Sequence, residues 1–160
     1  MSKASPRIEC NGDIDEAQAM LGLARAMTES SELNELLIDL ERDLWILMAD
    51  VATVPSAKKP KTPGSDEVTP EMVLKLEKLI DDFSERFEMP KEFVVPGETQ
   101  VGAILDLART IIRRAERMAV KASLSDSQVI PYLNRLSDLI WTLARWQDGN
   151  SLKTKSIKPK

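Results

Sequence analysis

Apolar residues recur at intervals of three and four along most of this chain, the spacing of residues on one face of an α-helix. This pattern predicts helices over residues 14–28, 31–52, 70–89, 99–122 and 127–147. No segment shows a convincing strand pattern, and runs of β-branched residues are few. Because the helices are long and most connections are short, the sequence predicts an all-α fold, a five-helix antiparallel bundle.

Residues that cap helices stand near several of these predicted starts. Asn11 or Asp13 is expected to cap the first helix. The third helix has a stronger start in residues 69–71, where a threonine hydroxyl is followed by proline and then by an acid near the positive end of the helix dipole. The segment 93–97 contains a proline and a glycine and is predicted to be extended.

The chain is predicted to form a single helical domain over residues 1–148. A polar loop at about residues 55–68 interrupts it, and its three prolines between residues 55 and 65 forbid regular structure. We expect the lysines of this loop to be solvated on a mobile surface segment. Residues 149–160 form a basic tail that is expected to be disordered.

Composition and charge exclude several functions. The net charge of -4 argues against a generally basic nucleic-acid binder, so any anion site must be local. The absence of histidine removes histidine-based acid–base chemistry and the commonest zinc ligands. The lone Cys10 cannot form an internal disulfide, which fits a reducing compartment. No apolar stretch is long enough to span a membrane, and we expect a cytoplasmic protein.

A cluster of arginines on the fourth predicted helix is the main candidate for chemistry. Arg109, Arg113 and Arg117 are spaced four residues apart and therefore share one stripe of the helix, with Glu116 beside Arg113. Guanidinium groups suit phosphate oxygens, so the stripe could hold a polyanion. From spacing alone, however, a solvated face or salt bridges between subunits are the favoured explanation, because surface arginine clusters are common.

Two other groups of polar and aromatic residues are candidates for a site wall. Four residues of the fifth predicted helix share a face by their spacing, and they could form a rim, an interface or part of a site: Asn134, Asp138, Trp141 and Arg145. Phe93 and Pro96 lie in the extended link between helices. An aromatic residue there is usually a core plug, although links at the ends of bundles also frame pockets.

Four motifs, taken in order, point to a known family. Residues 7–16 read RIECNGDIDE and are similar to RVEAYGTVDELN, and residues 93–97 read FVVPG and are similar to FVLPGG. Residues 108–117 read ARTIIRRAER and match ARTxxRRAER, and residues 132–145 read YLNRLSDLIWTLAR and match YLNRLSDxLFxLAR. Over residues 7–146 the chain resembles the PduO-type ATP:cob(I)alamin adenosyltransferases.

The resemblance implies an enzyme that transfers the adenosyl group of ATP to the reduced cobalt of cobalamin and releases triphosphate. It further implies a homotrimer with active sites between adjacent subunits, and ATP, magnesium and cobalamin as ligands. A reductase or an adenosylcobalamin-dependent acceptor enzyme would be a further partner. Reduced cobalt is itself a strong nucleophile, which fits a chain without histidine.

The same resemblance implies roles for the polar residues of the two long motifs. Arg113 would contact the ATP phosphates and stabilise the charge of the leaving triphosphate. Asn134 would contact the nucleotide, and Glu116 would help to place ATP or its magnesium without being a direct metal ligand. Asp138 and Arg135 would be supporting residues without a chemical role.

Three further residues take roles at the corrinoid and between subunits. Phe93 would press on the lower face of the corrin and exclude an axial ligand from the cobalt. Asp15 and Arg109 would pair across the subunit interface. These roles, like those of the phosphate-binding residues, come from the family resemblance.

The chain departs from the family pattern at a few positions. Only residues 1–6 precede the matching region, so the family's Thr/Gly-rich ATP-binding segment has no counterpart in this sequence. Asp106 replaces a histidine, Glu98 replaces a glycine and Gln18 replaces an asparagine. The two added acids predict weaker ATP binding. The alternatives are a non-catalytic paralogue that binds cobalamin or nucleotide as a carrier, sensor or assembly partner, and a purely structural bundle.

Overall fold

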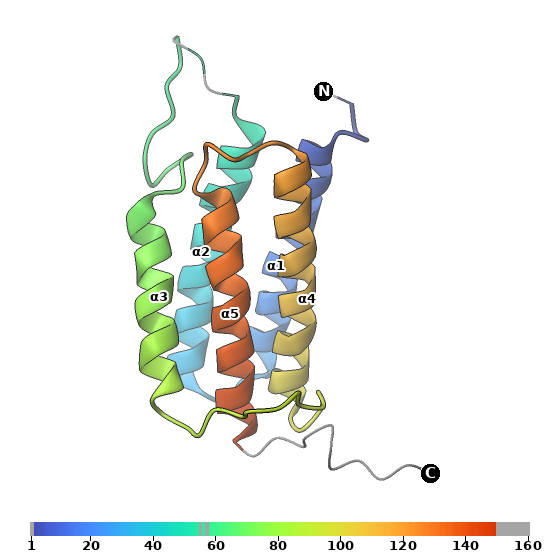
Figure 1. Cartoon of the computed structure of the whole chain (residues 1–160), viewed down its shortest axis with the longest axis vertical. Coiled ribbons are helices and arrows are strands. Elements are labelled where there is room, and N and C mark those ends of the chain that lie inside the picture. The colour runs from blue at the N-terminus through green and yellow to red at the C-terminus, as the bar shows by residue number, and fades with distance from the viewer. Residues whose placement is uncertain (1, 55, 57, 150–160) are drawn as a thin grey trace.

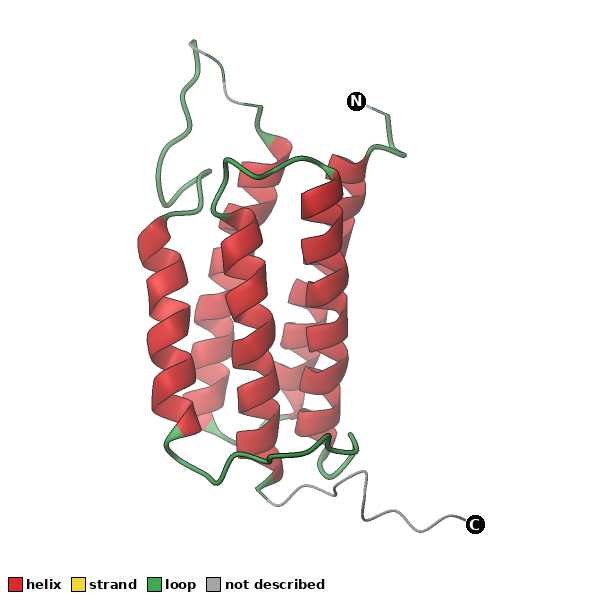
Figure 2. Cartoon of the chain, in the orientation of Figure 1, coloured by secondary structure: helices red, strands yellow, loops and turns green. Residues whose placement is uncertain are grey.

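The computed structural model describes residues 2–54, 56 and 58–149, which contain five α-helices and no β-strand (Figures 1 and 2). The helices are α1 (Pro6–Met27), α2 (Ser31–Ala52), α3 (Pro70–Ser84), α4 (Gln100–Lys121) and α5 (Val129–Asp148). The predicted all-α, five-helix fold is confirmed. The predicted basic tail lies almost entirely outside the described residues.

The helices alternate in direction around a common core. In Figure 1, α1, α3 and α5 run one way and α2 and α4 run the other way, as the antiparallel prediction requires. α4 packs against both α1 and α5, α2 packs against α1, and α3 packs against α5. The helix α3 therefore flanks the bundle, and α4 and α5 present a shared surface.

The first helix begins earlier than predicted. Ser5 is its N-cap and accepts a hydrogen bond from the Ile8 amide, and Pro6 occupies the first turn. Asn11 and Asp13 lie inside the helix, so the predicted caps and the predicted start at residue 14 are wrong. The reason is local: a serine followed by proline makes the same capped start as Thr69 before α3.

The core consists mainly of aliphatic residues at the predicted helical spacing. On α2 the apolar residues that recur every three or four positions are largely buried. The fully inaccessible ones are Leu33, Leu37, Leu40, Leu44, Leu47 and Val51. On α4, Ala108, Ile111 and Ala115 are buried, whereas Val101 and Ile104, which lie near the start of the helix, are half-buried.

The loop between α2 and α3 is anchored to the bundle by a buried carboxylate. Asp50 accepts hydrogen bonds from the Lys61 ammonium at 2.7 Å and from the Val68 amide at 2.8 Å. The hydroxyl of Ser127 lies 3.3 Å from both carboxylate oxygens. Lys61 is therefore mostly buried in an ion pair, and the prediction that the loop lysines are all solvated is wrong for this residue.

The connection from α3 to α4 crosses the end of the bundle where α5 finishes (Figure 1). Residues 93–97 form no helix, as predicted, but α3 ends at Ser84 and not at the predicted residue 89. The connection ends at Thr99, whose hydroxyl caps α4 by accepting a hydrogen bond from the Gly102 amide at 3.0 Å. This crossing segment, together with α4 and α5, builds the candidate site. None of the described helices is both long and apolar enough to cross a membrane.

Candidate functional site

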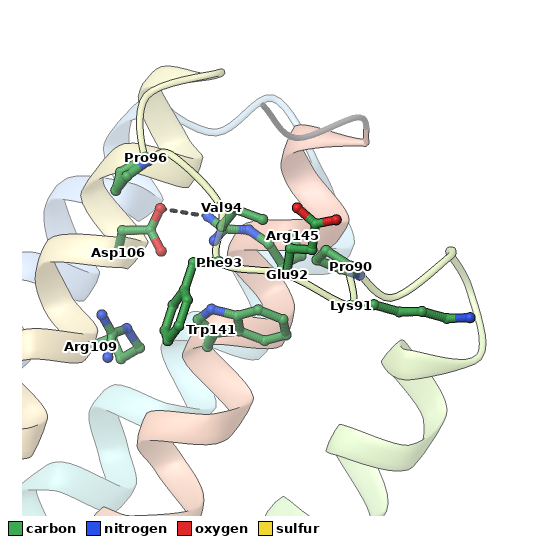
Figure 3. A pocket seen from close by; sticks show the side chains of 10 residues that line it. All are labelled: Pro90, Lys91, Glu92, Phe93, Val94, Pro96, Asp106, Arg109, Trp141 and Arg145. Carbon is green, nitrogen blue, oxygen red and sulfur yellow. Dashed lines mark hydrogen bonds and ion pairs between the residues drawn. The ribbon is translucent and has the colours of Figure 1, made fainter. Parts of the chain in front are cut away.

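A pocket of about 830 Å³ opens between the crossing segment and the adjoining ends of α4 and α5 (Figure 3). Several residues singled out in the sequence meet there. Its lining residues are Pro90, Lys91, Glu92, Phe93, Val94, Pro96, Asp106, Arg109, Trp141 and Arg145. Arg113, Glu116, Asn134 and Asp15 are not among them, so the structure of one chain does not bring all the predicted site residues into one cavity.

The aromatic side chains give the pocket an apolar wall. Phe93 is 89% exposed, so it is not the core plug that such a residue usually forms. In the view of Figure 3 its ring lies between the side chains of Arg109 and Trp141. An exposed ring beside a half-buried indole offers a surface suited to a large, flat ligand.

A buried ion pair forms the polar part of the pocket wall. Arg145 is 1% exposed, and its guanidinium donates a hydrogen bond to the Asp106 carboxylate at 2.5 Å. It also bonds to Asp148 at 3.2 Å and lies 5.5 Å from the centre of the Trp141 ring. Sequence reasoning missed this pairing, and treated Asp106 as an added negative charge. The structure shows that this charge is paired.

Burial raises the pKa of Asp106 above its ordinary value, and the hydrogen bond and charge of Arg145 oppose this effect only partly. When the pKa of an acid is higher in the folded chain than in the unfolded chain, the protonated acid stabilises the fold. This stabilisation is complete at a pH below the unfolded pKa, and it is lost as the pH rises through the folded pKa.

We therefore expect Asp106→Asn to raise the free energy of unfolding at neutral pH. The amide still accepts a hydrogen bond from Arg145, and Arg145 keeps Asp148 as a counter-ion. The gain in unfolding free energy over wild type should shrink as the pH falls toward about 4, the ordinary pKa of aspartate, because the wild-type carboxyl group is then also uncharged. Urea unfolding at several pH values between 7 and about 4 measures this gain. The exposed Asp39→Asn on α2 is the control. A variant less stable than wild type at neutral pH would contradict the prediction.

The arginine stripe of α4 is partly unpaired within the chain. Arg113 and Arg117 are exposed and form no ion pair with any described residue. Arg109 is half-buried at the pocket, and its Nε is a buried donor without a hydrogen-bond partner in the described chain. Since an unsatisfied buried donor is costly, water, a ligand or another subunit would be the acceptor for this group. The Nε of Arg145 is unsatisfied in the same way among the described residues.

The neighbouring acids of α1 are paired differently. Arg114 bonds to Asp13 at 2.9 Å and to Glu16, which ties α4 to α1 and neutralises one arginine of the cluster. Asp15, which lies between those two acids in sequence, is exposed. Among the described residues no ion pair joins Asp15 to Arg109, so a contact between them would have to be made by two subunits.

Glu116 and Asn134 meet on the shared surface of α4 and α5. The Asn134 amide donates to the Glu116 carboxylate at 3.0 Å and its oxygen accepts from Arg135 at 2.9 Å. Arg135 in turn pairs with Asp138. Arg113 lies three residues before Glu116, on the neighbouring turn of the same helix. The predicted nucleotide contacts therefore lie close to one another, beside rather than inside the aromatic pocket.

Comparison with known proteins identifies the family to which this architecture belongs. The profile of the cobalamin adenosyltransferase family matches residues 1–147. The chain belongs to this family. The predicted family and the predicted class of enzyme, a transferase, are thereby confirmed.

Individual relatives agree with the assignment. The chain is 35% identical over 151 residues to a corrinoid adenosyltransferase of Mycobacterium tuberculosis, a match that covers 91% of this chain and 77% of the relative. It is 31% identical over 161 residues to the corrinoid adenosyltransferase PduO of Citrobacter freundii, covering 99% of this chain. It spans 47% of that PduO protein, or about half its length.

Solved structures of the family share the fold. A variant PduO-type ATP:corrinoid adenosyltransferase from Lactobacillus reuteri, complexed with cobalamin and ATP, superposes with a TM-score of 0.85 at 27% identity. The match covers 99% of this chain and 88% of that one. A second variant of the same enzyme, complexed with ATP, has a TM-score of 0.82 at 28% identity, over 96% of this chain and 89% of that one.

Proposed function

We propose that this protein transfers the adenosyl group of ATP to the reduced cobalt of a corrinoid and releases triphosphate. The observation that carries the proposal is the arrangement on α4. Arg109 lines the aromatic pocket, and Arg113 stands one turn further along, about 6 Å by helix rise, with no ion-pair partner among the described residues. Membership of the cobalamin adenosyltransferase family supports the same activity.

The reaction requires that the protein position the two substrates and stabilise the charge of the leaving group, and it requires no protein nucleophile. A cobalt–carbon bond forms at C5′ of ATP while the bond from C5′ to the triphosphate oxygen breaks. The electron pair of that broken bond leaves with the triphosphate. A protein accelerates such a step by aligning the two substrates and by placing positive charge at the departing oxygens. A sequence without histidine is compatible with this chemistry.

We assign the nucleotide to the surface of α4 and α5 next to the pocket. Arg113 contacts the phosphates, because its exposed guanidinium is available for a bidentate bond to phosphate oxygens. Asn134 contacts the nucleotide. Glu116, held by Asn134 at 3.0 Å, helps to place ATP or its magnesium ion.

The residues of this site fit a magnesium ion that arrives bound to ATP, but not one held by the protein alone. Among the described residues there is no cluster of three or more carboxylate, cysteine or histidine side chains that could hold a metal alone. Magnesium carried by ATP needs only one or two protein carboxylates in addition to the phosphates and water. When bound, the ion supplies extra positive charge at the triphosphate, and Glu116 is the residue that would orient it.

We assign the corrinoid to the aromatic pocket. Phe93 would lie against the lower face of the corrin, since its ring is exposed at the pocket mouth. An apolar ring in that place excludes water and other axial ligands from the cobalt. Loss of the axial ligand makes the reduced state easier to reach, which is the state that reacts with ATP.

A homotrimer in the cytoplasm completes the proposal, with each site built between two subunits. The support within one chain is that Arg109 lacks a partner for its buried Nε while Asp15 is exposed. Pairing of Arg109 with Asp15 of an adjacent copy would satisfy the donor and place α1 of one subunit beside the pocket of another. A reductase or an adenosylcobalamin-dependent enzyme is the partner expected to supply or receive the corrinoid.

One assay tests this proposal against its alternatives. The protein is mixed with ATP, magnesium and cobalamin under a strong reductant, and the visible absorbance reports the cobalt–carbon bond. Formation of adenosylcobalamin with repeated turnover is the expected result. Corrinoid or nucleotide binding by titration without turnover would favour the non-catalytic paralogue. Absence of both binding and turnover would favour the remaining alternative, a purely structural bundle.

A further inference from the structure

A hydrogen-bonded chain of four polar residues joins the ends of α4 and α5 beside the pocket. Asp106 and Asp148 both accept from the buried guanidinium of Arg145, at 2.5 and 3.2 Å. The other oxygen of Asp148 accepts from the hydroxyl of Thr99 at 2.7 Å. We call these four residues the end network.

The contact between Asp148 and the first turn of α4 is exceptionally close. A Cβ atom added to Gly102 would lie 2.0 Å from the Asp148 carboxylate oxygen and 2.8 Å from the Thr99 hydroxyl oxygen. Only glycine lets the carboxylate reach the Thr99 hydroxyl without displacement. The last residue of α5 is thus held directly against the start of α4.

Both aromatic walls of the pocket are linked to this network, one through space and one along the chain. Trp141 lies one turn before Arg145 on α5, and its ring packs 5.5 Å from the guanidinium. Thr99 is the last residue of the segment that carries Phe93, and Pro96 between them limits the backbone freedom of the link. The guanidinium of Arg145 therefore connects the ring on α5 to the root of the loop that presents Phe93.

A gain in folding stability does not by itself explain why these charged residues of the end network are buried. A buried ion pair is often no more stabilising than apolar residues of the same volume, because both charges must lose their hydration. The geometry that it imposes is specific, however, since each hydrogen bond fixes both a distance and a direction. Two members of the network, Asp106 and Arg145, line the pocket, and Thr99 supports the loop that closes it.

We propose that the end network is a positioning device for the corrinoid. It holds Phe93 and Trp141 at the separation that the corrin requires, and so sets corrinoid affinity and the exclusion of the axial ligand without touching ATP. This inference rests on the proposed function. Arg145, Asp148 and Thr99 are positioning residues, and Phe93 is the residue in contact with the substrate.

The test uses two substitutions that break the network in different ways. Thr99→Val removes the hydroxyl and keeps the shape of the side chain, and Gly102→Ala pushes the Asp148 carboxylate away while removing no polar group. Thr99→Ser keeps the hydroxyl and is the conservative variant. Ser30→Ala is the matched control, since it removes the N-cap of α2 at the same end of the bundle and lies outside the pocket.

Steady-state kinetics and the visible spectrum of bound cob(II)alamin are the measurements, with circular dichroism to verify folding. Thr99→Val and Gly102→Ala should each raise the KM for corrinoid about tenfold, because small misplacements of binding groups are costly. Their KM for ATP should stay within about twofold of wild type, since uniform weakening would change both values. Their spectra should show an axial ligand on the cobalt. Thr99→Ser and Ser30→Ala should match wild type.

Equal behaviour of Thr99→Val and Ser30→Ala, or equal changes in both KM values, would overturn the positioning role while leaving the enzyme assignment intact. If the wild-type protein neither binds nor adenosylates corrinoid, the proposed function fails and this inference fails with it. If Gly102→Ala does not fold, the comparison of Thr99→Val with Thr99→Ser decides the outcome.

Discussion

Replacing Arg113 with alanine is expected to lower turnover about a hundredfold or more, the usual cost of removing one donor from a developing negative charge. Affinity for ATP should also weaken, because the guanidinium is proposed to bind the phosphates. The fold should persist, since Arg113 is exposed and forms no ion pair with any described residue. ATP titration and steady-state kinetics, with circular dichroism for the fold, measure these effects.

Arg117→Ala is the matched control for this prediction. Arg117 lies one turn further along the same stripe, is also exposed and has no assigned role at the phosphates. Its loss removes the same charge and should change turnover by less than about threefold, as expected for a screened surface charge. Unchanged nucleotide affinity in Arg113→Ala, or equal losses in both variants, would refute the role given to Arg113.

The second large effect is expected for Phe93→Ala. Turnover should fall by about ten- to a hundredfold, the range expected when reacting groups are misplaced. The spectrum of bound cob(II)alamin should show that an axial ligand remains. Stability should change little, because the side chain is 89% exposed and such surface substitutions alter unfolding free energies by only about 0.5 kcal/mol.

Leu74→Ala on α3 is the control for lost apolar surface, since Leu74 is exposed and does not line the pocket. It should leave both the spectrum and the rate unchanged. A Phe93→Ala variant with wild-type kinetics and an unchanged spectrum would show that the ring does not control the cobalt. In that case the pocket would need another role.

The helices were predictable because their burial follows a local period. The leucines of α2 and the Thr69–Pro70 start of α3 needed no knowledge of the rest of the chain. The start of α1 shows where this reasoning failed. Ser5 and Pro6 carry the same signal, but Asn11 and Asp13 also suit a cap and suggested a later start, although both lie inside the helix.

The pairing within the site was not predictable to the same degree. A carboxylate at residue 106, on the buried side of α4 beside Leu105 and Ala108, already implies a nearby cation, because an unpaired buried charge is costly. Which cation serves depends on how α5 packs against α4. Only the tertiary structure identifies Arg145 as that partner. The same holds for Lys61, whose buried partner lies on another element.

The arginine cluster illustrates both sides of this comparison. Its spacing predicted one stripe, and the structure places Arg113 and Arg117 on the exposed surface of α4 with Arg109 at the pocket. Spacing alone could not show that Arg114 is neutralised by acids of α1, since that contact joins residues about a hundred positions apart. The structure therefore separates one structural arginine from three that are available to ligands or to another subunit.

The most direct test of the central claim is the product balance of the wild-type protein. Reduced cobalamin, ATP and magnesium are combined, and the cobalt–carbon bond is followed by absorbance while triphosphate is quantified in the same samples. We predict that one triphosphate is released for each adenosylcobalamin formed, with neither product appearing when ATP or corrinoid is omitted. Corrinoid binding without either product, or phosphate release without a cobalt–carbon bond, would contradict the assignment of this protein as a corrinoid adenosyltransferase.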